Sequence, residues 1–586
     1  MKMRRTIWLT LAVAVNAILT TVSQASTDSC ISSTDGFWDE ARLWSLNKPP
    51  SIHQSAILIT NAASETVTID STTATHFKST LTISNLSVDA SSGGTDTLYL
   101  NDTGTIALHI LNDLVIGIAL TNQSPGAAEL ISTNSTLIVD GLMGGQFEDD
   151  GTVVVMGGSL ITTNCSLQVA PQSDAFYSPQ GLLIISNAIV QARDVTIASA
   201  SFSGARGTME VSGGKMTCSG LGIGDSNGDG DGGYGTFLAA DGCLLVVNGG
   251  IGIINGTMTV TNSSLLAGGV FLGSWKSIGN LVINNGTVNL SGGMEMGVGD
   301  VSGGSVSLNG GKLIVTNDVI TMGGSGSGGG RFSVSDGIFL GLTFLPYGGG
   351  LSFQGGTSIL SSNLWLPYFS SLNVGGGQLF VTNAPLWIDT TQCAVSGGLL
   401  AASTIQVGNF GPGILSLDAG SITVSTGVTV GNCAINSIGQ INQSGGELIV
   451  TNAAHTGFID VQDSQLVLSG GVLQVDKLVM TNGCSGFVHT GGTLIVGSVV
   501  LDPNAFQITS VAREGNDLRV TWLMAPGSTN ALQVSSGGKH GAYNTRGFKD
   551  IFVVTNNTTA GTLTNYLDIG AATNFPSRYY RARLAP

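Results

Sequence analysis

The feature that most constrains this chain is a short phrase that returns along its length. The phrase consists of two glycines, a short apolar strand and often Thr-Asn, as in GGSLITTN, GGKLIVTN, GGQLFVTN and GGELIVTN, which begin at Gly157, Gly310, Gly376 and Gly445. The Gly-Gly steps at positions 445, 470 and 491 are separated by 25 and 21 residues. Short strands bounded by Gly or Asn that recur at this period are typical of a β-solenoid, in which each coil stacks on the next.

Composition supports an all-β solenoid. Glycine makes up 86 of 586 residues, while 42% are hydrophobic and only 10% are charged. A chain this apolar must bury a core, so a disordered glycine-rich linker is excluded. Helical periodicity is almost absent. A set of separate β-sandwiches is the alternative fold, but sandwiches need hairpin loops every 8–12 residues and do not need one phrase per coil.

Alternation within the phrase predicts which side chains face inward. Along KLIVTN, Leu313 and Val315 point to one side of the strand, and Lys312 and Ile314 point to the other. We expect the side without the lysine to be the interior.

The residues that flank the strand are expected to form the corners of a coil. Gly310 and Gly311 can adopt positive φ without a Cβ penalty. Asn317 tolerates the left-handed region, and asparagines at equivalent corners are expected to stack as an amide ladder.

The first residues predict export. They comprise a basic start over 2–5, an apolar stretch over 7–19 and small residues at 23–25, so the mature chain is expected to begin at Ser26. An uncleaved membrane anchor is the alternative. No later run is long and apolar enough to span a bilayer, so we expect a secreted, extracellular or cell-surface protein.

The charge distribution predicts the domain boundaries. Residues 26–504 hold 10 Lys or Arg and 33 Asp or Glu, a net charge of −23, whereas residues 505–586 hold 8 and 4, a net charge of +4. We therefore expect a signal peptide over 1–25, a repeat domain over 26–504 with an N-terminal cap over about 26–60, and a C-terminal module over 505–586. An acidic body excludes nucleic acid as a partner, because phosphates need clustered Lys and Arg.

The C-terminal module is predicted to be a small β-sandwich of six or seven strands. Its candidate core aromatics are Trp522, Tyr566, Tyr579 and Tyr580. Two roles are open: a cap over the end of the solenoid, or a signal for secretion or surface docking.

The seven cysteines show no metal-binding pattern. They lie far apart and none forms a C-x-x-C pair, so a zinc or iron–sulfur site is not expected. Most are predicted to be small buried residues. A disulfide between Cys218 and Cys243 is the alternative if the two lie on adjacent turns.

The repeat segments resemble those of a known family. Segments such as GTMEVSGGKMTCSG from Gly207 and GSVSLNGGKLIVTN from Gly304 resemble the autotransporter-associated and PEP-CTERM-associated β-strand repeats of secreted bacterial proteins. The resemblance covers most of residues 36–500 and implies a right-handed parallel β-helix outside the cell, with no enzymatic activity common to its members. It also implies that Trp38 and Trp44 cap the first coil. The C-terminal module resembles fibronectin-III-like modules.

One segment matches half of a calcium-binding loop. In DSNGDGDGG, the candidate ligands are Asp225, Asn227, Asp229 and Asp231, with Gly230 at the turn. Alternate oxygen ligands followed by glycine suit Ca²⁺, although the bidentate Glu of an EF-hand and its helices are missing. The alternative is a solvated corner between coils. Calcium is the cofactor that this segment predicts, and no other cofactor is expected.

Two aromatic segments predict contact with polysaccharide. GLTFLPYGGG contains Phe344 and Tyr347, and NLWLPYFSS contains Trp365, Tyr368 and Phe369. The prolines in both segments predict loops, and exposed rings on a solenoid face stack on sugars. The alternative is that the rings fill coil corners.

No catalytic pattern accompanies these segments. The ten Lys and Arg residues of the repeat region are not grouped with its acids, and no H-E-x-x-H, G-x-S-x-G or P-loop is present. The sequence therefore favours a structural or adhesive surface protein that contacts polysaccharide or a surface matrix. A polysaccharide lyase or glycoside hydrolase on the same scaffold is the alternative.

Overall fold

The structure of the chain is a computed structural model. It describes residues 26–585 apart from a set of single positions and short segments. The positions outside the description within that range are 53, 60–63, 91–92, 118–126, 142, 145–150, 171–179, 200–203, 226–231, 275, 300–301, 324–328, 368–369, 463, 481–485, 502–506, 525–528, 538–546 and 558–561.

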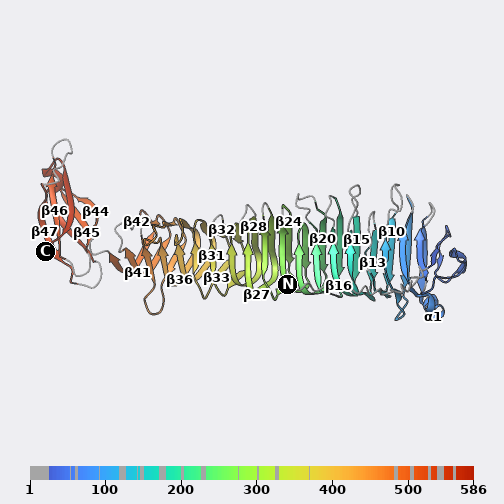
Figure 1. Cartoon of the computed structure of the whole chain (residues 1–586). Coiled ribbons are helices and arrows are strands. Elements are labelled where there is room, and N and C mark those ends of the chain that lie inside the picture. The colour runs from blue at the N-terminus through green and yellow to red at the C-terminus, as the bar shows by residue number, and fades with distance from the viewer. Residues whose placement is uncertain are drawn as a thin grey trace, which may run out of the picture.

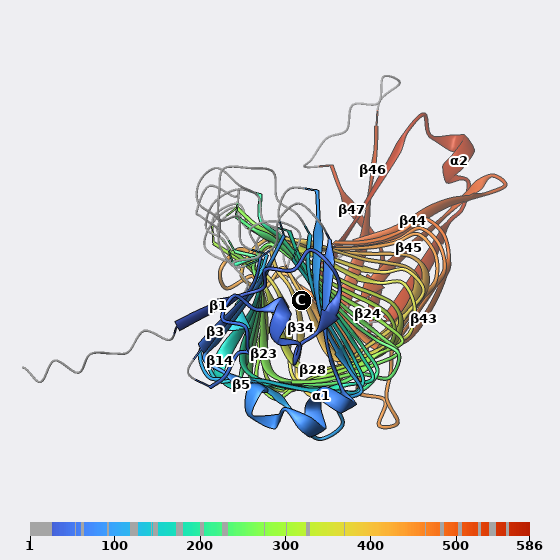
Figure 2. The ribbon, with the colours of Figure 1, turned by 90° about the vertical axis from the view of Figure 1, so that its right-hand side faces the viewer.

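Residues 26–501 form one 43-stranded sheet wound into a parallel β-solenoid of about 16 turns (Figure 1). Every coil passes through three faces, here called face A, face B and face C. Figure 2 looks along the axis from the N-terminal end: face A lies on the right around β24, face B lies below and face C lies on the left around β23. The chain passes clockwise through the faces as it recedes, so the solenoid is right-handed. Its ladders are parallel, which confirms the solenoid and contradicts separate sandwiches over this region.

Face A is built from strands that open each coil. These are β2 (Gly36–Phe37), β4 (Glu65–Asp70), β7 (Thr95–Asn101), β10 (Ala127–Thr133), β13 (Gly151–Met156), β15 (Gln180–Ser186), β17 (Arg206–Ser212), β20 (Tyr234–Ala240), β22 (Gly256–Thr261), β24 (Ile278–Asn284), β29 (Gly349–Phe353), β32 (Ser370–Val374), β37 (Gly439–Gln443), β40 (Gln465–Leu468) and β42 (Gly486–His489).

Faces B and C follow in each coil. Face B holds β5 (Thr82–Ile83), β8 (Leu108–Ile110), β11 (Thr136–Val139), β18 (Lys215–Cys218), β25 (Thr287–Leu290), β30 (Thr357–Leu360), β33 (Gln378–Val381) and β38 (Glu447–Val450). Face C holds β1 (Ser26–Ser29), β3 (Gln54–Ile59), β6 (Asn85–Asp89), β9 (Leu114–Ile116), β12 (Met143–Gly144), β19 (Gly220–Ile223), β26 (Met294–Val298), β31 (Leu364–Leu366), β34 (Leu386–Ile388) and β39 (Phe458–Val461).

Some strands continue around corners. Those that join faces B and C are β14 (Ser159–Val169), β16 (Ile189–Ile197), β21 (Leu244–Ile253), β23 (Ser264–Ser274), β41 (Val472–Met480) and β43 (Thr493–Leu501). Those that join all three faces are β27 (Gly303–Met322), β28 (Gly329–Pro346), β35 (Gln392–Val407) and β36 (Gly413–Val430).

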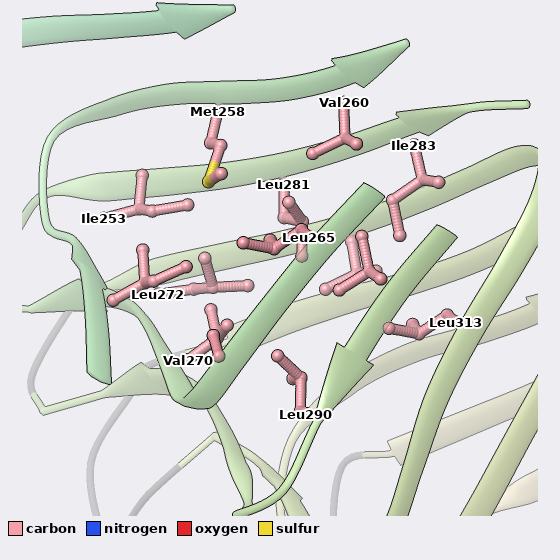
Figure 3. Packing of buried hydrophobic residues seen from close by; sticks show 14 of the residues in the cluster. Ile253, Met258, Val260, Leu265, Val270, Leu272, Leu281, Ile283, Leu290 and Leu313 are labelled. Carbon is pink, nitrogen blue, oxygen red and sulfur yellow. The ribbon is translucent and has the colours of Figure 1, made fainter. Parts of the chain in front are cut away.

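The interior is a continuous apolar column. Leu313 and Val315 are fully buried, whereas Lys312 and Ile314 are only half-buried on the outer side of face B, as the alternation predicts. Figure 3 shows inward side chains from all three faces packed together, including Met258 of face A, Leu265 and Leu290 of face B and Val270 of face C. Because parallel strands stack in register, identical positions of successive coils pack directly on one another.

The corner between faces A and B explains the Gly-Gly phrase. Gly310 and Gly311 have φ values of 124° and 79°, which confirms their predicted role. A Cβ on Gly311 would collide with the carbonyl oxygen of Gly286 in the coil below, so glycine is needed for space as well as for conformation.

The prediction for Asn317 is confirmed for its position and wrong for its conformation. Asn317 lies where β27 turns from face B to face C, between Val315 and Val319, but it does not have positive φ. Left-handed asparagines lie instead at the corner between faces A and B, as at Asn134 and Asn262. The expected amide stacking occurs as a pair in which Asn309 Nδ2 donates to Asn284 Oδ1 at 3.1 Å.

A second glycine column opens face A. Nine successive coils carry glycine at the same inward position, namely Gly151, Gly181, Gly207, Gly235, Gly256, Gly279, Gly304, Gly330 and Gly349. At Gly279, a Cβ would collide with the carbonyl oxygen of Ile253, which ends the face C part of β21 in the coil before. The corner between faces C and A is therefore closed by backbone instead of by side chains.

The N-terminal end is closed by aromatic side chains. Trp38 and Trp44 are fully buried, their ring centroids lie 4.9 Å apart, and Trp44 Nε1 donates to the Trp38 carbonyl oxygen at 2.8 Å. Three short helices also belong to the first coils, namely η1 (Ala41–Leu43), α1 (Ser71–His76) and η2 (Lys78–Thr80).

The C-terminal residues form two three-stranded antiparallel sheets beyond the last coil (Figure 1). Their elements are β44 (Gln507–Glu514), β45 (Asp517–Met524), β46 (Thr529–Ser536), β47 (Lys549–Thr555), β48 (Thr562–Asp568), α2 (Ala571–Asn574) and β49 (Arg578–Leu584). Trp522 is fully buried between the sheets, and Tyr566 and Tyr580 pack against it in the same cluster.

The last coil of the solenoid is less well covered than the others. Phe487, Leu494 and Val496 occupy interior positions but are only partly buried. In Figure 1 the C-terminal sheets stand clear of this end. Side chains of the described residues therefore do not close the C-terminal end as the tryptophans close the N-terminal one.

Candidate functional site

The structure describes only one of the four predicted calcium ligands. Asn227, Asp229 and Asp231 lie outside the described residues, and Asp225 precedes that gap with its backbone N–H donating to the Gly233 carbonyl oxygen. No group of three or more His, Cys, Asp or Glu that could hold a metal ion occurs in the part of the chain that is described. Calcium stays a prediction, to be tested by calorimetric titration of the repeat domain.

Five cysteines of the described residues are free: Cys30, Cys218, Cys243 and Cys393, which are buried, and Cys433, which is exposed. Cys165 is also buried. Cys218 and Cys243 lie in adjacent coils, but Cys218 is paired with Val247 across the coils, so the proposed disulfide is not formed.

The predicted aromatic residues separate into three groups. Phe344 is fully buried in the core beside Phe332, so its assignment to a sugar-stacking surface is wrong. The segment that carries it is strand β28, whose alternation turns Phe344 inward. Tyr347 is 44% exposed, as predicted. Trp365 lies half-buried on the outer side, but it belongs to strand β31 and not to the expected loop. Tyr368 and Phe369 lie outside the described residues.

Trp365 belongs to a group of outward-facing rings on face C. Trp365 in β31 is in register with Trp387 in β34, one coil further on, and their ring centroids lie 6.0 Å apart. The Trp387 centroid lies 5.9 Å from that of Phe410, which is 58% exposed at the next corner. We call Trp365, Trp387 and Phe410 the aromatic patch.

Local sequence explains why these rings face out. The triplets LWL in β31 and LWI in β34 place apolar residues at both inward positions, and Leu364, Leu366, Leu386 and Ile388 are all fully buried. Alternation leaves the central tryptophan outside. Trp387 and Phe410 were missed in the sequence, although two such triplets spaced 22 residues apart, from Leu364 to Leu386, would have indicated adjacent coils.

A buried carboxylate holds the aromatic patch in place. Asp389 Oδ2 accepts a hydrogen bond from Trp365 Nε1 at 3.2 Å. Asp389 Oδ1 accepts from the backbone N–H groups of Asn409 and Phe410 at 2.6 and 2.9 Å. One side chain thus orients a ring in one coil and fixes the corner that carries another ring two coils later.

The same face carries a groove of about 470 Å³ nearer the N-terminus. Its floor contains Gly250, Gly269 and Gly293, which follow one another in successive coils at the corner between faces B and C. Its remaining walls include Phe271 and Glu295. We call this depression the glycine groove.

Close stacking of coils restricts two of the three floor positions to glycine. A Cβ on Gly269 would lie 2.9 Å from the Gly293 carbonyl oxygen and one on Gly293 would lie 2.8 Å from the Val319 carbonyl oxygen, whereas one on Gly250 would meet nothing closer than 3.8 Å. In the next coil, Val319 takes the place of the floor glycines, and the Oδ1 atom of the preceding Asp318 accepts a hydrogen bond from the Val319 N–H at 2.7 Å. Val319 therefore ends the floor, and Asp318 adds a carboxylate to the groove.

Comparison with protein-family models, with curated proteins and with solved structures finds no match to the chain. The resemblance to autotransporter-associated and PEP-CTERM-associated repeats stays a prediction. No helix among the described residues is long and apolar enough to cross a membrane.

Proposed function

We propose that this chain is a secreted or cell-surface structural and adhesive solenoid that binds polysaccharide through the aromatic patch. The observation that carries the proposal is the set of three neighbouring rings on the outside of consecutive coils. Aromatic rings are large apolar surfaces with a polarised face, and rings left outside a core are a common feature of binding surfaces. The export-like residues 1–25 support a location outside the cytoplasm.

Binding to a polysaccharide panel tests the proposal. Residues 26–586 would be titrated with soluble plant, algal and bacterial polysaccharides, and retardation in gels that contain each polymer would be measured. Trp387→Ala is expected to weaken binding about tenfold, since this removes the central ring of the patch.

Tyr234→Ala is the matched control. Tyr234 is also an exposed aromatic residue, but it lies on face A. Equal retardation of wild type and the Trp387→Ala variant, with both folded by circular dichroism, would contradict the role of the patch. Failure of the wild type to bind any polymer would contradict polysaccharide binding itself.

Glycan cleavage is the second candidate function, and the glycine groove is the observation that favours it. Glycoside hydrolases act through a pair of carboxyl groups on either side of the scissile bond, and Glu295 and Asp318 line one groove. Release of new reducing or unsaturated ends by the wild type, abolished in Glu295→Gln, would establish this activity in place of binding alone.

A further inference from the structure

The glycine groove and the aromatic patch lie along one line of face C. Pairing across coils places Gly252, Phe271, Glu295, Thr321 and Leu345 in one outward register. The next coil continues the same face with Trp365, which is in register with Trp387. The groove and the patch are therefore consecutive stretches of one surface track that runs parallel to the solenoid axis.

The spacing along this track is set by the sheet. Phe271 and Trp365 are separated by four coil-to-coil steps. Neighbouring parallel strands lie about 4.8 Å apart, so the two rings are about 19 Å apart along the axis. An extended polymer lying on face C would contact both sites at once, whereas a very short oligomer would contact only one.

The chemistry of the glycine groove restricts its ligand. Glu295 and Asp318 supply carboxylate oxygens, which accept hydrogen bonds from hydroxyl or amino groups. Its lining includes Phe271 as an aromatic wall, and the described lining residues contain no Lys or Arg. The glycine floor lets a ring-shaped ligand approach the backbone closely, because no side chain projects there.

We propose that the glycine groove is a second polysaccharide-binding site on face C, and that the polymer it shares with the aromatic patch carries no acidic groups. This inference rests on the proposed function and specifies its ligand class. A hydroxyl-bearing sugar ring packs on Phe271 and donates hydrogen bonds to Glu295 and Asp318. A uronate polymer would place its carboxylates against these two carboxylates and against a repeat region of net charge −23.

The first experiment compares ligand charge. Wild-type residues 26–586 would be titrated at low ionic strength with a neutral β-glucan, a neutral galactomannan, chitosan oligosaccharides, polygalacturonate and alginate. Binding to a neutral or amino-bearing polymer at least about tenfold tighter than to either uronate polymer is expected. Equal or tighter binding to polygalacturonate or alginate would overturn the ligand class.

The second experiment locates the groove with variants. Phe271→Ala is expected to weaken binding of the preferred polymer about five- to tenfold. The double variant Glu295→Gln with Asp318→Asn is expected to reduce the difference in affinity between neutral and uronate polymers. Glu447→Gln, which changes an exposed carboxylate on face B, is the matched control and should alter neither value. A Phe271→Ala protein that folds and binds like the wild type would overturn the groove assignment.

Oligosaccharide length separates failure of this inference from failure of the proposed function. With oligomers that cannot span the two sites, Phe271→Ala and Trp387→Ala should each affect a separate weak binding event. With longer oligomers of the same sugar, affinity should rise steeply and both variants should reduce it. If length has no effect and only Trp387→Ala matters, the aromatic patch binds glycan alone and the shared track is excluded. If neither variant matters for any length, the proposed function fails as well.

Discussion

At the start of face A, the residue type at one inward position changes from coil to coil along the solenoid. Strands β4 and β7 carry Glu65 and Asp96 there, β10 carries Ala128, and glycine follows from Gly151 onward. In the glycine coils the backbone of face C fills the corner, so no side chain fits. In the first coils the same position accepts a carboxylate, and Glu65 is only 3% exposed.

Burial of Glu65 makes stability of the first coils depend on pH. Burial raises the pKa of Glu65 from 4.5 to about 7. The charges of Asp96 and Asp35 add to this rise, and the nearby Cys30 thiol opposes it. Between pH 4.5 and 7, the native state therefore keeps a proton on Glu65 that the unfolded chain has already released. Stability is highest below this window and falls through it, by roughly 3 kcal/mol or less at higher pH.

Replacing Glu65 tests this dependence. Glu65→Gln should raise the stability of the first coils at pH 8 and remove the loss between pH 5 and 7. Hydrogen exchange of the β4 and β7 amides across this pH range is the measurement. Protection in β4 that changes with pH equally in the wild type and the variant would exclude Glu65 as the cause.

The alternation of face B gives a second prediction at this scale. Leu313→Ala removes a fully buried side chain and should cost about 2–5 kcal/mol of unfolding free energy, whereas Lys312→Ala should change it by about ±0.5 kcal/mol. Urea denaturation of the two variants is the check. Similar losses at both positions would contradict the inward orientation of Leu313.

Among the elements, the corner after β34 does the most to shape the candidate site. Asp389→Ala removes the acceptor for Trp365 Nε1 and for two backbone N–H groups. We expect a loss of about 1–3 kcal/mol in stability, since buried donors lose their partner. We also expect increased mobility of the Trp365 ring, seen as faster fluorescence depolarisation.

Asp389→Asn separates packing from charge. The amide keeps one oxygen but can satisfy fewer of the three donors, so it should lie between the wild type and Asp389→Ala in both measurements. Asp418→Ala is a suitable control, because Asp418 accepts a hydrogen bond from Ser444 but lies away from the rings. Wild-type values in Asp389→Ala would show that the tryptophan triplets position the patch unaided.

Sequence patterns predicted the local structure of a strand and its corners better than they predicted where a segment lies within its coil. The alternation of Leu313 and Val315 and the positive φ of Gly310 and Gly311 follow from local chemistry, and the structure confirms them. Pro346 and the glycines that follow Phe344 predict a loop, yet the register of the coils places Phe344 on strand β28 with its ring facing inward.

The candidate site was predicted only in part, for a similar reason. Trp365 was identified, but the contact between Trp365 and Trp387 depends on coil length, which varies along the chain. The glycine groove could not be predicted, because it needs glycine pairs of three coils to align at one corner and Asp318 to follow them in the next coil. Such alignment exists only once the coils are stacked.

At the scale of the whole molecule, stacking in register predicts tolerance of coil removal. Deleting residues 256–278 joins Asn255 to Gly279, which occupies the position of Gly256 one coil later. Each repeat contacts mainly its neighbours, so the shortened chain should fold with a slightly lower unfolding midpoint. Circular dichroism with a urea titration is the measurement.

A shorter deletion provides the control for coil removal. Deleting residues 256–267 removes part of a coil and brings a face C segment to a face A position. This variant should lose cooperative unfolding, because its inward and outward side chains no longer align with those of the neighbouring coils. Equal stability of the two deletions would contradict register as the basis of the architecture.

The direction of the ladder hydrogen bonds has a mechanical consequence. They run along the solenoid axis from coil to coil, as between β22 and β24. A pull applied to the two ends along this axis loads the bonds of one coil at a time, so the molecule would unzip in small successive steps, each releasing a coil of chain. A load applied across the axis, as from a polymer drawn over face C, is shared by many coils. The protein would thus yield gradually when stretched and resist when sheared.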